Sequence, residues 1–403
     1  MADLEWIRAL QQKAAGKIVL LVLDGLGGLP IEPGGPTELE AAHTPNLDRL
    51  ATEGTLGQTL PIGRGITPGS GPAHLALFGY DPIRYQVGRG VLESIGVGLE
   101  VHKGDVAARG NFCTVNALGK ITDRRAGRIP TEEAAPIVER LARLQVPGVR
   151  SEVRAVREYR FALVMRGRGL EPDIADTDPQ QTGVEPLPAR ALQPGSERAA
   201  EQVNAWIGQA RTALAGEPKA NALTLRGFST DPDLPQFPDI FGLRAACAAV
   251  YPMYRGVSRL VGMDVLRFEG DRPADEFSAV GRVWQEYDFF FIHIKKTDSM
   301  GEDGNFDGKV AVIEAVDAAL PALLGLGPAA LAVTGDHSTP SRLRSHSWHP
   351  VPLLLWAPAS ALPDDQTTFG ERACSIGGFG TIPATDVMPL LMGHAGRLAK
   401  YGA

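Results

Sequence analysis

Three apolar segments of the chain each lead, within a few residues, to an aspartate: Asp24, Asp298 and Asp336. An imidazole follows the third at His337, and another, His346, precedes a fourth apolar segment. Carboxylates and imidazoles without a thiolate suit Mn²⁺, Mg²⁺ or Zn²⁺. Negative charges brought this close would repel one another unless cations lay between them. Each aspartate taken singly could equally cap a helix or a turn, so only the whole set indicates a metal site.

A serine that could act as a nucleophile lies at Ser70, in the sequence TPGSGPAHL of residues 67–75. Gly69 and Gly71 allow a close approach to the backbone, and Pro72 suits the first turn of a helix. The hydroxyl would then lie where amide dipoles stabilise a phosphate or an alkoxide. Taken alone, the segment is more typical of a helix-capping serine. Coordination to a divalent metal would activate the hydroxyl, which makes Ser70 a candidate nucleophile.

Basic residues that could hold an anionic substrate gather after residue 105, and Lys295 directly follows an apolar segment. The guanidinium group matches both carboxylate and phosphate oxygens, which a small phosphorylated acid would require. The alternative for each of these residues is a charged side chain on the protein surface that contacts only solvent. The arginine candidates are Arg109, Arg124, Arg125 and Arg128. The histidines without a ligand pattern are expected to be structural or exposed: His43, His102, His293 and His394.

The elements that must position these residues alternate between strands and helices. Apolar periodicity predicts helices over 309–324 and 384–394. The alternation indicates an α/β sheet with helices on both faces, and ligands bind beyond the carboxyl ends of the strands in such sheets. His346 would join the aspartates if the chain entered its next strand at the same edge. The short apolar runs predicted as buried parallel strands are Lys17–Leu23, Tyr287–Ile294, Ala329–Thr334 and Pro352–Ala357.

The length of 403 residues favours two domains. The middle of the chain is rich in Arg and Pro and contains a helical pattern over 132–144. We therefore predict a discontinuous core, 1–105 with 221–403, and an inserted domain over 106–220.

Composition excludes several classes of protein. Hydrophobic residues make up 44% and charged residues 22%, as in soluble globular proteins. The net charge of -7 gives no basic footprint for nucleic acid. Three widely spaced cysteines form neither a disulfide framework nor a metal clip, which fits a reducing cytoplasm. The N-terminal residues are unlike a signal peptide, and no apolar stretch approaches the roughly 20 residues of a membrane span. We expect a cytoplasmic protein without nucleic-acid or membrane partners.

Together these motifs resemble the archaeal-type branch of the cofactor-independent phosphoglycerate mutases, in the alkaline phosphatase superfamily. The resemblance spans nearly the whole chain and depends on many short motifs in the same order. They are VLDG at 22–25, HTPNLD at 43–48, GS at 69–70, AHL at 73–75, FGYDP at 78–82, RGNF at 109–112, TDRRAGR at 122–128, DTDP at 176–179, YPMYRG at 251–256, GDH at 335–337 and PVP at 350–352 behind His346.

The resemblance implies an alkaline-phosphatase-like core with a mostly parallel sheet flanked by helices, and a smaller inserted α+β lid domain. In the family, serine takes the phosphoryl group of 2- or 3-phosphoglycerate and returns it to the other hydroxyl, a step of glycolysis and gluconeogenesis. Two divalent metal ions are implied, Mn²⁺ before Mg²⁺ or Zn²⁺. One would be held by Asp24, Ser70, Asp336 and His337, and the other by Asp298, Glu302 and His346. The implied substrate contacts are Arg109, Arg124, Arg125, Arg128 and Lys295, with Arg226 as a further candidate.

This sequence departs from the family pattern at Glu302, where the pattern has a histidine four residues after the aspartate. A carboxylate in place of an imidazole favours harder ions such as Mn²⁺ or Mg²⁺ over Zn²⁺. A milder departure places Gly71 and Pro72 where the family usually has a polar pair.

Two other functions remain open at this level. The same core could serve another phosphomutase or a phosphatase, since fold alone does not choose the substrate. Alternatively, the protein could be a silent binding protein that kept the fold and lost a metal. The sequence does not predict an oligomeric state.

Replacing Glu302 by histidine tests the departure from the family pattern. We expect Glu302→His to keep or raise activity and to shift metal preference towards Zn²⁺, because the new ligand is softer. Activity measured against Mn²⁺ and Zn²⁺ concentration checks this. Loss of all metal binding would show that Glu302 does not occupy a ligand position.

Overall fold

The computed structural model describes residues 4–402, which divide into two compact units. One unit comprises the described residues up to Gln86 together with those from Pro235 onward, and the second is Val87–Leu234. The expected insert, 106–220, lies within the second unit. That unit extends further at both ends because a strand over Ala222–Ser229 pairs with a strand over Val106–Val115, and a helix over Arg89–Gly96 packs on both.

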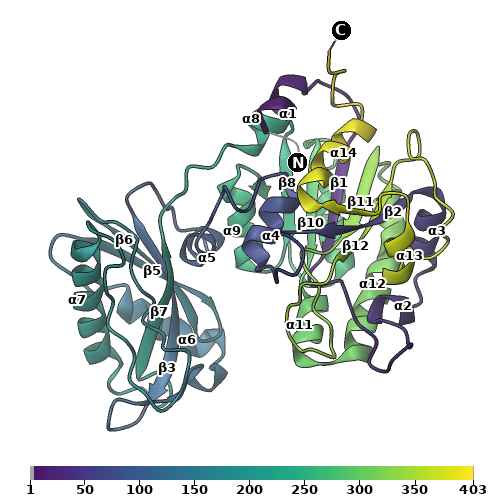
Figure 1. The fold of residues 1–403 in the computed structure, drawn as a ribbon. Coiled ribbons are helices and arrows are strands. Elements are labelled where there is room, and N and C mark those ends of the chain that lie inside the picture. The colour runs from purple at the N-terminus through teal and green to yellow at the C-terminus, as the bar shows by residue number, and fades with distance from the viewer. Residues whose placement is uncertain (1–3, 403) are drawn as a thin grey trace. The chain divides into compact units, whose positions relative to one another are not determined.

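The first unit is built on an eight-stranded sheet with the order β13-β2-β12-β11-β1-β10-β8-β9 (Figure 1). The central strands β11, β1, β10 and β8 are parallel and fully buried, as their continuous apolar runs predict. The predicted strand positions are confirmed to within two residues at each end. The strands are β1 (Ile18–Leu23), β2 (Thr55–Leu60), β8 (Ala245–Ala249), β9 (Asp264–Val265), β10 (Phe289–Ile294), β11 (Ala330–Thr334), β12 (Val351–Trp356) and β13 (Thr381–Pro383).

The prediction that the fourth apolar run is a parallel strand was wrong, because β12 runs antiparallel to both β11 and β2. A parallel connection needs a crossover, usually a helix, to return the chain to the opposite edge. The segment 335–350 forms no helix and remains at the carboxyl edge of the sheet, so the next strand begins there and runs back. This reversal is what brings His346 to the same edge as the aspartates.

Helices cover both faces of this sheet. Val19 and Leu21 of β1 share a core with α3, α10 and α12, whereas Phe78 and His74 pack on Phe291 from the other face. The predicted helices over 309–324 and 384–394 are confirmed. The helices of this unit are α1 (Leu4–Leu10), α2 (Glu38–Ala41), α3 (Pro45–Glu53), α4 (Ser70–Leu77), α8 (Phe237–Phe241), α9 (Pro252–Leu260), α10 (Pro273–Arg282), α11 (Lys296–Asp303), α12 (Phe306–Leu324), α13 (Glu371–Ile376), the 3₁₀ turn η2 (Ala384–Asp386) and α14 (Val387–His394).

The second unit is a five-stranded antiparallel sheet with its own core. β3 pairs with β6, β7 and β4, and β5 pairs with β6. Phe161 and Trp206 belong to one core cluster with residues of α6 and α7. Its elements are α5 (Arg89–Gly96), β3 (Val106–Val115), β4 (Ile121–Asp123), η1 (Ala126–Arg128), α6 (Thr131–Leu141), β5 (Arg150–Arg157), β6 (Arg160–Arg166), α7 (Glu197–Leu214) and β7 (Ala222–Ser229).

Within residues 4–402, no helix is long and apolar enough to cross a bilayer. Cys113, Cys247 and Cys374 are all buried free thiols.

The core of the second unit leaves no room for a side chain at Gly110, in the middle of β3. A Cβ atom there would lie 2.0 Å from Cζ of Phe161, so Gly110→Ala must displace a buried ring. We expect a loss of about 1–3 kcal/mol in the free energy of unfolding, measured by urea titration followed by tryptophan fluorescence, to which Trp206 of this core contributes. Gly208→Ala is the matched control: this exposed residue of α7 has open space at its Cβ, so alanine should stabilise the helix by about 1 kcal/mol. Equal effects of the two substitutions would contradict the packing described.

Candidate active site

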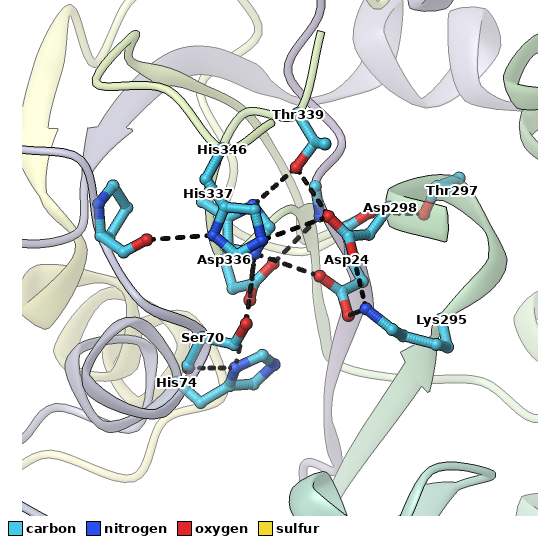
Figure 2. Close-up of polar contacts among 12 residues, drawn as sticks. Asp24, Ser70, His74, Lys295, Thr297, Asp298, Asp336, His337, Thr339 and His346 are labelled. Atoms are coloured by element: carbon cyan, nitrogen blue, oxygen red, sulfur yellow. Dashed lines mark hydrogen bonds and ion pairs between the residues drawn. The ribbon is translucent and has the colours of Figure 1, made fainter. Parts of the chain in front are cut away.

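The predicted ligands of the first unit converge at the carboxyl edge of its sheet (Figure 2). Asp24 directly follows β1, Asp298 lies in the first turn of α11 after β10, and Asp336 with His337 follows β11. Ser70 is the first residue of α4, as the helix-start prediction requires. The three carboxylates and His337 are at most 1% exposed. Side chains far apart in the sequence are therefore buried together.

Four donor atoms face one another in the first candidate metal group. His337 Nε2 lies 3.3 Å from Asp24 Oδ1 and 3.2 Å from Asp336 Oδ2, and Ser70 Oγ is 3.3 Å from the same nitrogen. Both carboxylate oxygens are buried and lack a hydrogen-bond partner among the described residues. Ligand atoms about 2.0–2.2 Å from one tetrahedral centre lie about 3.3–3.6 Å apart. The spacing and the free oxygens therefore fit one divalent cation.

Hydrogen bonds hold both histidines with Nε2 free to bind a cation. Thr339 Oγ1 lies 2.9 Å from His337 Nδ1 and 2.7 Å from Asp298 Oδ1. Because an ionised carboxylate only accepts, Thr339 donates to Asp298 and accepts from Nδ1–H of His337. His346 Nδ1 donates in the same way to the carbonyl of Pro68 at 3.2 Å. Such outer hydrogen bonds orient histidine ligands in metal sites, and burial keeps His337 neutral by lowering its pKa well below 6.5.

The second candidate metal group consists of Asp298, His337 and His346, whose donor atoms lie within 4.8 Å of one another. His346 Nε2 is 3.5 Å from Asp298 Oδ1, and its ring stacks on that of His337 at 3.6 Å between centroids. Glu302 lies at the edge of this group. Its Oε1 is 4.0 Å from His346 Nε2, and its side chain is 57% exposed.

Lys295 lies among the carboxylates of both groups. Its Nζ donates to Asp24 Oδ2 at 2.9 Å and to Asp298 Oδ2 at 2.5 Å. Burial alone would raise the pKa of Asp24, but the charge of Lys295 and the nearby imidazoles hold it well below 3.8. Burial, followed by the charge of Asp24, raises the pKa of Asp336 well above 3.8. The ammonium thus compensates the charge of Asp24, while burial and the charge of Asp24 favour the protonated form of Asp336.

The sequence predicts no supporting role for several side chains of this site, although Tyr254 and His74 lie within the family motifs at 251–256 and 73–75. Tyr254 donates to Asp24 Oδ2 and stacks on His293, whose Nε2 lies 3.4 Å from the same oxygen. His293, expected to be structural or exposed, is fully buried against a candidate ligand. His74 donates from Nδ1 to the carbonyl of Ser70 at 2.7 Å and so fixes the start of α4. Their partners lie far away in the sequence, apart from the contact within α4, so local patterns do not reveal them.

The candidate arginines belong to the second unit, where three of them have acidic neighbours. Arg124 Nη2 lies 3.0 Å and Arg226 Nη1 3.5 Å from the same oxygen of Asp178. Arg109, which faces Arg226 in the register of β3 and β7, is 3.9 Å from Glu93. Burial lowers the pKa of Arg109 to about 10, and its buried Nε has no hydrogen-bond partner within the described part of the chain. An unpaired buried donor of this kind suits an anionic ligand.

Arg125 and Arg128 are exposed and flank an unusual turn. Ala126, Gly127 and Arg128 all have positive φ, at 47°, 63° and 49°. The carboxylate of Asp123 accepts the N–H groups of Arg125 at 2.8 Å and Gly127 at 2.6 Å, which stabilises the turn. Left-handed backbone outside glycine is costly and is concentrated at functional sites.

Fold and site define an α/β protein with candidate metal groups at the carboxyl edge of one sheet and a cluster of arginines in a second unit. A family model described as 2,3-bisphosphoglycerate-independent phosphoglycerate mutase matches residues 51–220. A relative from Thermus thermophilus, named "Probable 2,3-bisphosphoglycerate-independent phosphoglycerate mutase", is 52% identical over 98% of each chain. One of the same name from Aquifex aeolicus is 52% identical over 98% of this chain and 99% of its own. The chain belongs to the 2,3-bisphosphoglycerate-independent phosphoglycerate mutase family.

Solved structures agree with this assignment. A protein from Pyrococcus horikoshii is 31% identical and superimposes with a TM-score of 0.83 over 98% of this chain and 100% of its own. A cofactor-independent phosphoglycerate mutase from Thermoplasma acidophilum, also 31% identical, gives a TM-score of 0.71 over 94% and 100% of the two chains. The fold class predicted from the sequence is therefore confirmed.

The raised pKa of Asp336 predicts that metal uptake releases protons. Below that pKa the carboxyl group holds a proton that a cation must displace, so Mn²⁺ affinity should fall as pH falls and rise as pH increases towards the pKa. Calorimetric titration with Mn²⁺ in buffers of different ionisation enthalpy measures the protons released. Asp336→Asn, which has no such proton, should bind Mn²⁺ more weakly and release fewer protons. Tight uptake without proton release at low pH would contradict the assignment.

Proposed function

We propose that the protein interconverts 2-phosphoglycerate and 3-phosphoglycerate through a phosphoserine at Ser70. The observation that carries the proposal is the pair of unpartnered oxygens on Asp24 and Asp336, which face His337 Nε2 with Ser70 Oγ beside it. A nucleophile at the start of α4 and a set of donor atoms able to hold a divalent cation are what phosphoryl transfer requires. Family membership supplies the substrate.

The proposal includes two divalent cations, with Mn²⁺ favoured by the number of oxygen donors. Asp24, Ser70, Asp336 and His337 would hold one of them. Asp298, Glu302 and His346 would hold the other. When bound, the ions would lower the pKa of the serine hydroxyl and offset charge on the phosphoryl oxygens.

The residues of the chain then have distinct tasks. Ser70 Oγ loses its proton and forms a bond to phosphorus as the bond from phosphorus to the substrate oxygen breaks, and the oxygen that leaves takes up a proton. In the second step the other hydroxyl of the bound glycerate loses its proton and attacks the phosphoserine, and the freed Ser70 oxygen takes up a proton. Lys295, whose ammonium lies beside Asp24, would contact phosphoryl oxygens once cations compensate the carboxylates.

The arginines of the second unit would hold the glycerate during this exchange. The unpaired Nε of Arg109 suits the substrate carboxylate, and Arg124 and Arg226 lie next to each other at Asp178. Arg125 and Arg128 remain candidates on the neighbouring turn. In this proposal the second unit acts as a lid, because water must be excluded for the phosphoserine to return its phosphoryl group to the substrate. A cytoplasmic location and a phosphoglycerate as the small-molecule partner, with no nucleic-acid or membrane partner, complete the proposal.

An assay coupled to enolase tests this function directly. Purified protein with Mn²⁺ should convert 3-phosphoglycerate to 2-phosphoglycerate without added 2,3-bisphosphoglycerate. Rapid hydrolysis of a generic phosphate ester without turnover of 3-phosphoglycerate would instead make the protein a phosphatase. Binding of at most one ion without either activity would make it a silent binding protein.

The variant Ser70→Ala tests whether Ser70 is the nucleophile, because it removes the hydroxyl and leaves the other residues of the site unchanged. We expect this variant to fold and to bind Mn²⁺, with turnover reduced at least about 1,000-fold, because no covalent intermediate can form. Intact-mass spectrometry after addition of 3-phosphoglycerate should show a phosphoryl adduct for the unmodified protein and for Ser278→Ala, an exposed serine of α10. An adduct that persists in Ser70→Ala would place the nucleophile elsewhere.

A further inference from the structure

Lys309, in the first turn of α12, directs its ammonium group at three backbone carbonyl oxygens. The side chain is fully buried, and Nζ donates to Gly25 O at 2.8 Å, to Gly27 O at 3.1 Å and to Thr339 O at 3.0 Å. A lysine ammonium has three donors, so these contacts use its whole capacity. One side chain therefore connects the loop after β1 to the loop after β11.

These two loops carry most of the candidate ligands. The N–H of Gly25, next to Asp24, donates to Asp336 Oδ1 at 3.1 Å. Thr339 donates from its hydroxyl to Asp298 and accepts from His337. A shift of either loop would therefore change the distances among donor atoms in both candidate metal groups.

The contact between the loops is close, which makes their spacing sensitive to the group that joins them. A Cβ atom on Gly25 would lie 2.5 Å from Thr339 Oγ1, and one on Gly27 would lie 1.9 Å from Ser338 Oγ. Thr339 N also donates to the carbonyls of Gly25 at 3.2 Å and Gly27 at 3.0 Å. The two loops are thus held together both by their own backbone and by Lys309.

The carboxylate that balances the charge of Lys309 is hydrogen-bonded to the loop after β11. Glu38 Oε1 lies 4.0 Å from Lys309 Nζ and accepts both the N–H of Ser341 at 2.7 Å and its hydroxyl at 2.6 Å. A buried charge is tolerated only when it is paired and hydrogen-bonded, and removing one member leaves the others uncompensated. The buried ammonium is therefore a specific component of these loops that an apolar side chain cannot replace.

We propose that Lys309 is a positioning residue that sets the spacing of the two ligand loops and thereby the affinity of the site for divalent cations. This inference rests on the proposed metal centre. Without the ammonium, three carbonyl oxygens would converge on an apolar side chain, and each would lose a donor. The loops would separate or admit water, and the donor atoms would lose the spacing that fits a cation.

Lys309→Met, which keeps the length of the side chain and removes its donors, tests the proposal. We expect Mn²⁺ affinity, measured by calorimetry, to fall about 10–100-fold, the range seen when supporting partners of metal ligands are removed. Hydrogen exchange of the metal-free protein should become faster in both 24–28 and 336–341, which is a readout independent of metal and of activity.

Two control variants distinguish a loss of loop positioning from a general loss of protein stability. Lys17→Met removes an ammonium that donates to the carbonyl of Tyr287 at 2.7 Å, at the amino end of β1, and should leave Mn²⁺ affinity within twofold. Ile313→Ala removes a buried side chain one turn further along α12 and should lower the melting temperature without changing Mn²⁺ affinity or exchange in the two loops. If Ile313→Ala weakened Mn²⁺ binding as much as Lys309→Met, Lys309 would have no positioning role.

A second variant keeps the test decisive if Lys309→Met does not fold. Lys309→Gln retains an amide donor for some of the carbonyls, and we expect a smaller loss of affinity with faster exchange in the same two loops. Unchanged exchange and unchanged affinity in Lys309→Gln would overturn the inference. Absence of Mn²⁺ binding by the unsubstituted protein would instead refute the proposed metal centre, while the exchange measurement would still decide whether Lys309 holds the loops.

Discussion

Mutual repulsion among buried carboxylates is the constraint on which the rest of this site depends. Asp24, Asp298 and Asp336 are brought within reach of one another because parallel strands end at one edge of the sheet. Burial strengthens their repulsion, since little water is left to screen it. Lys295 compensates part of the charge, and the oxygens left unpaired on Asp24 and Asp336 are those that a cation would bind.

Orientation of the ligands depends on a chain of hydrogen bonds in which every proton has a definite place. The hydroxyl of Thr339 accepts from His337 and donates to Asp298, so it connects the two candidate metal groups and sets the tautomer of one histidine. The carbonyl of Pro68 does the same for His346. A proton on the wrong nitrogen would turn a ligand into a donor facing a cation. These supporting contacts therefore matter as much as the ligands themselves.

The two units have different chemical roles in the proposed reaction. The first unit supplies the nucleophile and the donors for cations, which suit any phosphate ester, whereas the arginines of the second unit suit the carboxylate of a phosphorylated acid. Arg109 and Arg226 are neighbours because β3 and β7 pair in a fixed register, although the two residues are far apart in the sequence. In the proposed reaction, substrate choice and bond cleavage would thus belong to different compact units of the chain.

Local sequence was sufficient to locate the strands at 17–23, 287–294 and 329–334, because buried parallel strands are continuous apolar runs, and to indicate the candidate ligands that follow them. It also located Ser70 at a helix start, because the glycines and the proline there are typical of a turn that leads into a helix. Only the tertiary structure decided the reversed direction of β12 and the exposed position of Glu302 beside its group. It alone revealed the support from Thr339, Tyr254 and Lys309. The physical reason is that a ligand type follows from chemistry and local backbone, whereas a hydrogen-bond partner in this site follows from packing between segments up to 311 residues apart.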